Sequence, residues 1–117
     1  MKYLLLCLFF VPTLVSAATP EELKLFARHV AVAQKINPVK FINTMRCESN
    51  FNQSARGLAG EIGVAQYLPN SFQKHKDLMG YGSLSIYSGF DQLALAALVW
   101  KEHPARMREW TCAWKYI

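Results

Sequence analysis

The residue best placed for chemistry is Glu48, a glutamate in the setting of a general acid. If residues 38–50 form a helix, Phe41, Met45 and Glu48 recur at i, i+4 and i+7 and share one helix face. The carboxyl group then continues an apolar stripe, and burial among apolar side chains raises a carboxyl pKa toward neutral pH. The negative end of the helix dipole acts in the same direction. The alternative is a solvated glutamate in a frayed last turn, which is the commoner setting for a helical glutamate.

A glycine-rich loop separates Glu48 from a second polar segment. Gly57, Gly60 and Gly63 recur at every third residue and are followed by Gln66. Glycine at this density lets the backbone lie close to a ligand or adopt positive φ. The order G-x-G-x-x-G is absent, so a nucleotide-binding loop is not indicated. A plain surface loop would explain the glycines equally well.

Two short segments together resemble a known enzyme family. The first is Glu48-Ser49, and the second runs from Gly63-Val64-Ala65-Gln66 into Tyr67-Leu68-Pro69-Asn70-Ser71-Phe72. In order and separation they resemble the catalytic core of the soluble lytic transglycosylases, lysozyme-like enzymes that cleave bacterial peptidoglycan. In that family a Glu-Ser pair at a helix end carries the catalytic acid, and a Gly-aliphatic-x-Gln segment follows. The sequence departs from the family in its late helix, because residues 95–100 lack the Tyr and Asn of the family's Ala-Tyr-Asn-Ala-Gly segment.

The resemblance implies a peptidoglycan lytic transglycosylase, a lyase that breaks the β-1,4 bond between N-acetylmuramic acid and N-acetylglucosamine. Glu48 would protonate the bridging oxygen while the substrate's N-acetyl group stabilises the developing cation. Glu48 would then take the proton of the muramoyl C6 hydroxyl, which closes on C1 and leaves a 1,6-anhydromuramoyl end. One acid thus serves both steps. The implied fold is mainly α, an α+β lysozyme-like domain.

Five residues are candidates for substrate contact: Ser49, Gln66, Tyr67, Tyr87 and Tyr116. Ser49 and Gln66 would position the acid and the acetamido group through hydrogen bonds. The missing third motif leaves open which tyrosine supports the substrate, and Tyr87 and Tyr116 are both candidates. Tyr87 belongs to a Gly/Ser/Tyr loop that suits a sugar cleft, because hydroxyls hydrogen-bond and rings cover pyranose faces.

Two other functions remain open. A muramidase would use the same fold and acid, with Glu61 or Asp91 helping water to attack, since lysozyme-type retention uses two carboxylates about 5 Å apart. No second acid has an obviously catalytic setting, because Glu61 lies in the loop, Asp77 in a basic helix and Asp91 in a first helical turn. The other function is an exported, disulfide-stapled module that binds glycan or a protein partner, which the missing Ala-Tyr-Asn segment keeps open.

Residues 1–18 have the features of a secretory signal peptide. Met1-Lys2-Tyr3 carries positive charge, residues 4–15 are mostly apolar, and Ser16-Ala17-Ala18 offers cleavage after Ala17 or Ala18. The apolar run is shorter than the ~20 residues that a membrane-spanning helix needs. We therefore expect export to the periplasm or secretion, no stable membrane insertion after cleavage, and one domain at residues 19–117.

The cysteine count indicates a disulfide. Of the three cysteines, Cys7 leaves with the signal peptide, and Cys47 and Cys112 remain. In an exported protein a remaining pair favours one disulfide bond, Cys47-Cys112. Two free thiols or a metal pair are the alternative, although no histidine lies near either cysteine in the sequence.

The charge balance is mildly basic, with 13 basic and 8 acidic residues, which suits envelope polymers rich in carboxylate and phosphate. The basic residues are scattered, so no nucleic-acid partner is expected, and the one cluster, Lys74-His75-Lys76, predicts a solvated helix face. Without H-E-x-x-H, paired C-x-x-C or a nucleotide loop, neither a metal nor an organic cofactor is implied. We expect a monomer that acts on peptidoglycan glycan strands, with a secretion or envelope complex as a candidate partner.

Two helices must position Glu48. Thr19-Pro20-Glu21-Glu22 predicts a capped helix start, and that helix continues to about residue 35. Asn37-Pro38 stops it and opens the second helix, 38–50, which carries Glu48.

The rest of the chain supports this pair. Short extended pieces at 58–67 would form a small β element, and a third helix spans about 69–79 and ends at Gly80. Residues 90–103 are apolar on most sides, which predicts a buried central helix packed against the Glu48 helix. Pro104 ends it, and a last turn or two follows at 105–110.

Overall fold

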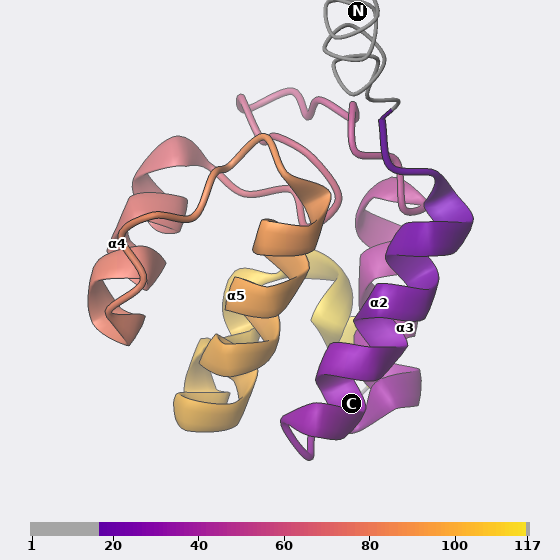
Figure 1. The fold of residues 1–117 in the computed structure, drawn as a ribbon, viewed down its shortest axis with the longest axis vertical. Helices are drawn as coiled ribbons and strands as arrows, with labels where there is room; N and C mark the ends of the chain where they lie inside the picture. Colours follow the sequence, from indigo (N-terminus) through magenta and orange to yellow (C-terminus); the bar gives the residue numbers. More distant parts are fainter. Residues whose placement is uncertain (1–16, 117) are drawn as a thin grey trace, which may run out of the picture.

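Residues 17–116, the part of the chain that the computed structural model describes, contain four α-helices and two 3-10 helices joined by loops (Figure 1). The side chains of residues 114–116 are not described. Nearly all of the predicted signal peptide, residues 1–16, lies outside the described residues. The elements are α2 Pro20–Ala33, α3 Pro38–Ser49, α4 Pro69–Met79, α5 Gly89–Glu102, η2 Pro104–Glu109 and η3 Thr111–Tyr116.

The helices begin and end at the capping residues that the sequence predicts. Thr19 and Glu22 make a full capping box, in which Thr19 Oγ1 accepts the Glu22 N–H and Glu22 Oε1 accepts the Thr19 N–H. Asn37 Oδ1 caps α3 by accepting the Lys40 N–H at 3.1 Å. Gly80 ends α4 in the left-handed conformation at φ 77°. The predicted bounds of all four α-helices are confirmed to within about two residues.

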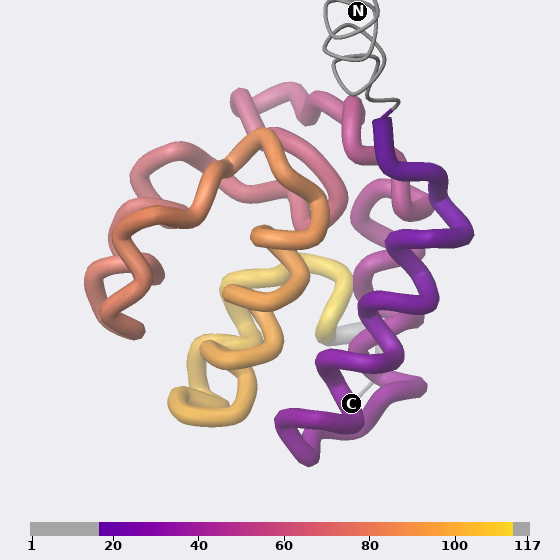
Figure 2. Tube along the Cα trace, in the orientation of Figure 1, coloured from indigo at the N-terminus to yellow at the C-terminus, as the bar shows by residue number. Residues whose placement is uncertain are grey.

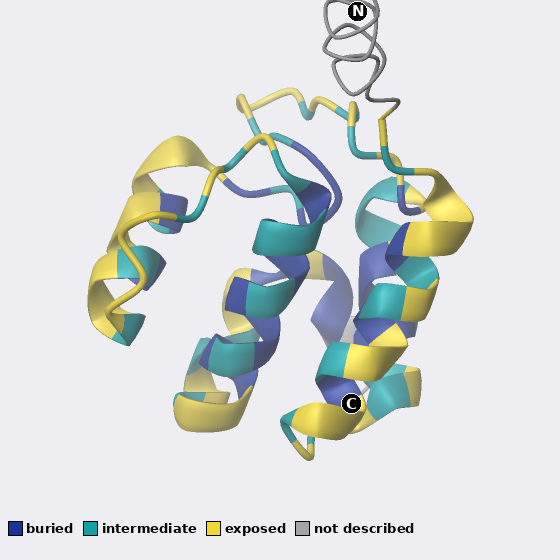
Figure 3. Ribbon diagram, viewed as in Figure 1, coloured by how far each residue is buried: buried dark blue, intermediate teal, exposed yellow. Residues whose placement is uncertain are grey.

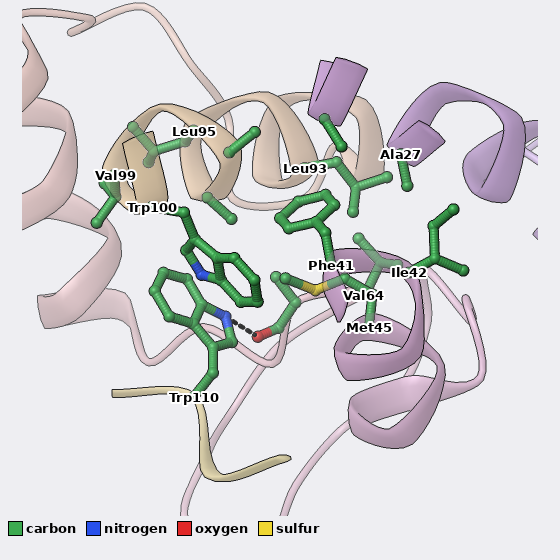
Figure 4. Packing of buried hydrophobic residues seen from close by; sticks show 14 of the residues in the cluster. Ala27, Phe41, Ile42, Met45, Val64, Leu93, Leu95, Val99, Trp100 and Trp110 are labelled. Atoms are coloured by element: carbon green, nitrogen blue, oxygen red, sulfur yellow. Dashed lines mark hydrogen bonds between the residues drawn. The ribbon is translucent and has the colours of Figure 1, made fainter. Parts of the chain in front are cut away.

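Three of the described helices, α2, α4 and η2, pack directly on α5. Residues of α2 contact both α3 and α5, α4 packs on α5, and η2 and η3 pack on α5 and α3 respectively. The buried faces of α2, α3 and α5 point toward one another, as the dark blue segments show (Figure 3). The predicted contact between α5 and the Glu48 helix is made by large side chains, with the Phe41 and Trp100 rings edge to face at 5.1 Å (Figure 4).

A disulfide joins Cys47 of α3 to Cys112 of η3, as predicted. The bond connects residues that are 65 positions apart in the sequence, and it returns the end of the chain to the side of α3 (Figure 2). A cross-link across a loop of this length contributes ~2–4 kcal/mol to folding stability. The start of η3, at Cys112, is therefore fixed directly beside Glu48.

The predicted β element is wrong for residues 58–67. Among the described residues there is no strand, only two isolated antiparallel bridges, Arg56 to Ile62 and Ile62 to Tyr67. Gly63 and Gln66 both have positive φ, at 81° and 51°, so the chain turns back within four residues instead of extending. The described helices include none long and apolar enough to cross a bilayer.

Candidate active site

A pocket of about 150 Å³ lies beside Glu48. Its walls come from the end of α3, the loop that precedes α4, α4 itself, and the 3-10 helices that follow α5. The lining residues are Glu48, Glu61, Gln66, Tyr67, Leu68, Ser71, His75, Glu109, Trp110 and Thr111. The two sequence segments that carry the family resemblance therefore meet at one pocket.

Glu48 is the second-last residue of α3 and is partly buried. The apolar stripe below it is as predicted, because Phe41 and Met45 are fully buried in the core. Glu48 Oε2 accepts the backbone N–H of Cys112 at 3.1 Å. Cys112 is the disulfide partner of Cys47, the residue before Glu48. The hydrogen bond from Cys112 therefore fixes the Glu48 carboxylate at the pocket wall.

Ser49 does not line the pocket. Its hydroxyl donates to the Val64 carbonyl at 2.6 Å, and a longer contact of 3.4 Å reaches the Met45 carbonyl in the preceding turn. Both of these hydrogen bonds of the Ser49 hydroxyl go to backbone carbonyls. Ser49 instead ties the end of α3 to the Gly63–Gln66 segment, which makes it a positioning residue for the second motif.

The Gly63–Gln66 segment is also held by Gln92 of α5 and by Trp110, which lies between η2 and η3. The buried Gln92 side chain accepts the Ala65 N–H at 2.8 Å and donates to the carbonyls of Ile62 at 2.9 Å and Ile86 at 2.6 Å. Trp110 Nε1 donates to the Ala65 carbonyl at 3.1 Å, the dashed bond in Figure 4. Both polar groups of the Ala65 backbone are thus satisfied by side chains distant in sequence.

Gly63 is required by this arrangement. Its φ of 81° disfavours any residue with a side chain, and a Cβ there would lie 2.5 Å from Gln92 Nε2. This role of Gln92 was not predicted from the sequence, although a lone amide in an otherwise apolar helix is a signal for a buried hydrogen-bonding role.

Gln66 lies in the pocket, as predicted, with its Nε2 donating to the Gly63 carbonyl at 2.9 Å. Glu61 lines the same pocket, and its Oε1 accepts the Ala59 N–H at 2.8 Å. A Cβ on Gly57 would lie 2.5 Å from Glu61 Oε1 and 2.8 Å from Gln66 Oε1. The absence of a side chain at Gly57 therefore lets both polar groups occupy this corner. Glu61 and Glu109 thus bring further carboxylates to the pocket that holds Glu48.

Tyr67 begins a polar chain that runs from the core to the exposed Glu109. Its hydroxyl lies 2.9 Å from His75 Nδ1, and His75 Nε2 lies 2.9 Å from Glu109 Oε1. Arg106 donates to the other Glu109 oxygen at 3.0 Å. Burial raises the pKa of the Tyr67 hydroxyl well above its usual range, and the Glu109 charge adds to the rise. Burial lowers the pKa of His75, although its hydrogen bond to Glu109 opposes the shift.

The predicted solvated face at Lys74-His75-Lys76 is wrong for His75, which is only 1% exposed. His75 lies three residues after the buried Phe72 on α4, so both side chains face the core while Lys74 faces solvent. The pairing of His75 with Glu109 was not predicted, because the two residues lie 34 positions apart in the sequence.

Of the two other predicted substrate contacts, only the side chain of Tyr87 is described. Tyr87 is 68% exposed and is not among the residues that line the pocket. The Tyr116 side chain falls outside the described residues. Within the described part of the chain, no group of three or more His, Cys, Asp or Glu side chains is arranged to hold a metal ion.

A scan against protein-family models, a search of curated proteins and a search of solved structures found no significant match to this chain. Function is therefore inferred from the pocket and from the two motifs that form it.

Proposed function

We propose that the protein is a peptidoglycan lytic transglycosylase in which Glu48 is the single acid and base. The observation that carries the proposal is that Glu48 and Gln66, from two motifs separated in sequence, line one pocket. The contacts made by Ser49, Gln92 and Trp110 support it, because they fix the second motif at the end of α3. Such preorganisation of the groups around a catalytic acid is what a catalytic site requires.

The reaction uses Glu48 twice. Its carboxyl proton goes to the oxygen that links C1 of N-acetylmuramic acid to N-acetylglucosamine, and the C1–O bond breaks as the substrate's acetamido group stabilises the cation. The Glu48 carboxylate then takes the proton of the C6 hydroxyl, and O6 bonds to C1. No water is consumed, and Glu48 ends protonated, as it began. Gln66 orients the acetamido group through its side-chain amide, and Tyr67 contacts the sugar.

The fold that we propose for this activity is lysozyme-like, with the loop at residues 51–68 in the place of the β element. We also propose export to the periplasm or secretion, which the oxidised Cys47–Cys112 pair supports because disulfides persist in oxidising compartments. Peptidoglycan glycan strands are the proposed partner. The protein works as a monomer, either alone or delivered by a secretion or envelope complex.

A muramidase is the second candidate, and the position of Glu61 favours it. Glu61 lines the pocket with Glu48, whereas Asp91 does not and accepts the backbone N–H of Ser85 at 2.9 Å. In a muramidase Glu61 would help water to attack C1, and the product would carry a reducing end.

Muropeptide release separates these functions. Purified peptidoglycan is treated with wild type, Glu48→Gln, Glu61→Gln and Glu102→Gln, and the soluble products are identified by mass spectrometry. Glu102 is an exposed acid at the end of α5 and serves as the charge-matched control. We expect anhydro-ended products from all but Glu48→Gln, which should lose at least ~100-fold in rate because it has no acid to donate. Reducing ends that disappear in Glu61→Gln would establish the muramidase instead.

A further inference from the structure

The polar chain Tyr67-His75-Glu109 lies in the wall of the pocket, yet the single-acid mechanism gives no role to His75 or Glu109. Tyr67 and His75 are 3% and 1% exposed, so both are almost fully removed from solvent. Buried polar groups are costly to the fold unless each finds a partner, and a fully satisfied network specifies one arrangement of its protons. The geometry defines that arrangement.

The proton positions follow from Glu109. A carboxylate only accepts hydrogen bonds, so the ring nitrogen that faces it, His75 Nε2, carries the hydrogen. Burial lowers the His75 pKa, which keeps the ring neutral near pH 7, so Nδ1 has no hydrogen and accepts. The Tyr67 hydroxyl, 2.9 Å from Nδ1, must therefore donate to it. Its hydrogen points to His75, and its oxygen keeps its lone pairs for another donor.

The Tyr67 ring is held in this orientation. Its backbone exchanges hydrogen bonds with Ile62 in both directions, at 2.8 and 3.0 Å. The ring packs edge to face against Phe72 at 5.1 Å and Trp110 at 5.6 Å. A hydroxyl on a ring clamped in this way is preorganised for a ligand, because little freedom is lost when the ligand binds.

We propose that Glu109 and His75 are positioning residues that fix the Tyr67 hydroxyl as a hydrogen-bond acceptor at the pocket wall. There it binds an N–H or O–H donor of the ligand, such as a sugar hydroxyl or the acetamido N–H of an N-acetylated sugar. The ligand class rests on the proposed function. The direction of the hydrogen bond from Tyr67 to His75 does not rest on it, since that direction follows from the contacts among Tyr67, His75 and Glu109.

Acid should therefore reverse the direction of the hydrogen bond between Tyr67 and His75. When His75 gains a proton, Nδ1 becomes a donor, and the Tyr67 hydrogen must turn away from it. The charged groups that act on His75 are Glu109 and Arg106 from η2 and Lys74 from its own helix. Ligand affinity should fall as pH drops through the lowered His75 pKa, below the usual histidine value of about 6.5.

The first test measures the His75 tautomer in the whole protein by ¹⁵N NMR of the imidazole nitrogens near pH 7.5. We expect hydrogen on Nε2 and none on Nδ1 in the wild type. In Glu109→Gln this preference should be lost, because the amide can donate as well as accept, while Glu102→Gln should retain it. A hydrogen on Nδ1 in the wild type would overturn the proposal.

The second test measures binding of chitotetraose, a soluble N-acetylated sugar, by calorimetry across pH 5 to 8. Tyr67→Phe and Glu109→Gln should each weaken binding about 3–10-fold at neutral pH, the loss expected for one hydrogen bond. Glu102→Gln should bind as the wild type does, and Tyr67→Phe should lack the acid-side fall in affinity. Binding that is absent from the wild type, or unchanged in Tyr67→Phe, would overturn the proposal. Neither test needs cleavage, so a protein that binds the sugar without cutting peptidoglycan would contradict the proposed enzyme and leave this inference standing.

Discussion

The backbone N–H of Cys112 donates to the Glu48 carboxylate at 3.1 Å, although the two residues lie 64 positions apart in the sequence. Cys112 is held there by its disulfide to Cys47, the residue that precedes Glu48. The covalent cross-link and the hydrogen bond thus act on the same turn of α3. The disulfide does more than restrict the unfolded chain, because it also positions a donor on the proposed catalytic acid.

Replacing both cysteines should therefore reduce activity as well as stability. We expect Cys47→Ala with Cys112→Ala to lower the free energy of unfolding by ~2–4 kcal/mol, the usual contribution of a native disulfide. Activity should fall even at temperatures where the variant is folded, since Glu48 loses its positioned donor. Urea unfolding and the rate of peptidoglycan cleavage measure the two effects. Equal rates for the folded variant and the wild type would contradict the positioning role.

Gly63 should tolerate no side chain. Gly63→Ala places a Cβ 2.5 Å from Gln92 Nε2 at a positive φ, so we expect a loss of roughly 2–4 kcal/mol in unfolding free energy, from strain and displaced hydrogen bonds together. Gly60→Ala is the matched control, because Gly60 also has positive φ, at 94°, but a Cβ there meets nothing. The control should lose only ~1–2 kcal/mol. Similar losses in the two variants, measured by urea unfolding, would mean that Gln92 does not constrain position 63.

Gln92 should tolerate replacement by an apolar residue poorly. In Gln92→Leu the Ala65 N–H and the Ile62 and Ile86 carbonyls lose their side-chain partner, and buried groups left without partners destabilise by ~1–3 kcal/mol each. We expect the loss to reach at least ~3 kcal/mol, with little cleavage activity remaining. Gln73→Leu, at an exposed position on α4, should change stability by less than ~0.5 kcal/mol. Chemical denaturation of the two variants beside the wild type tests this prediction. Comparable losses of stability in both variants would mean that the Gln92 hydrogen bonds do not stabilise the fold.

His75 should make stability depend on pH in a defined direction. Its pKa in the folded protein lies below its value in the unfolded chain, chiefly because of burial. Between these two values the unfolded state binds more protons, so stability falls as pH drops from about 6.5 through the folded pKa and levels off below it.

Urea unfolding from pH 4 to 8 should show this slope in the wild type and in His29→Gln, whose histidine is exposed on α2. In His75→Gln the slope across that window should be reduced. A slope that His75→Gln leaves intact would assign the acid sensitivity to other groups.

Local signals in the sequence predicted most of the helical frame. The Thr19 capping box, the Asn37-Pro38 break and the Gly80 stop each act within one or two turns, so a short stretch of residues is enough to specify them. The disulfide was predicted because two cysteines remain once Cys7 is removed with the signal peptide. The resemblance of the two motifs to one catalytic core implied that Glu48 and Gln66 lie together, and both line one pocket.

The parts that the sequence did not predict depend on packing between distant segments. Gln92 bonds to residues 27 and 30 positions away, and His75 bonds to Glu109 34 positions away, so no local pattern encodes either pair. Tyr87 was favoured by the composition of its loop, but composition does not determine which way a loop faces. The glycine-rich segment could not extend into strands because its turn at Gly63 and Gln66 adopts positive φ.

The most direct test of the proposed chemistry is cleavage of purified peptidoglycan in H₂¹⁸O, followed by mass spectrometry of the muropeptides. If Glu48 delivers the C6 hydroxyl to C1, the new muramoyl ends are 1,6-anhydro and carry no ¹⁸O. New muramoyl ends that are reducing and contain one ¹⁸O from the solvent would contradict this account, because water and not the C6 hydroxyl would then have attacked C1.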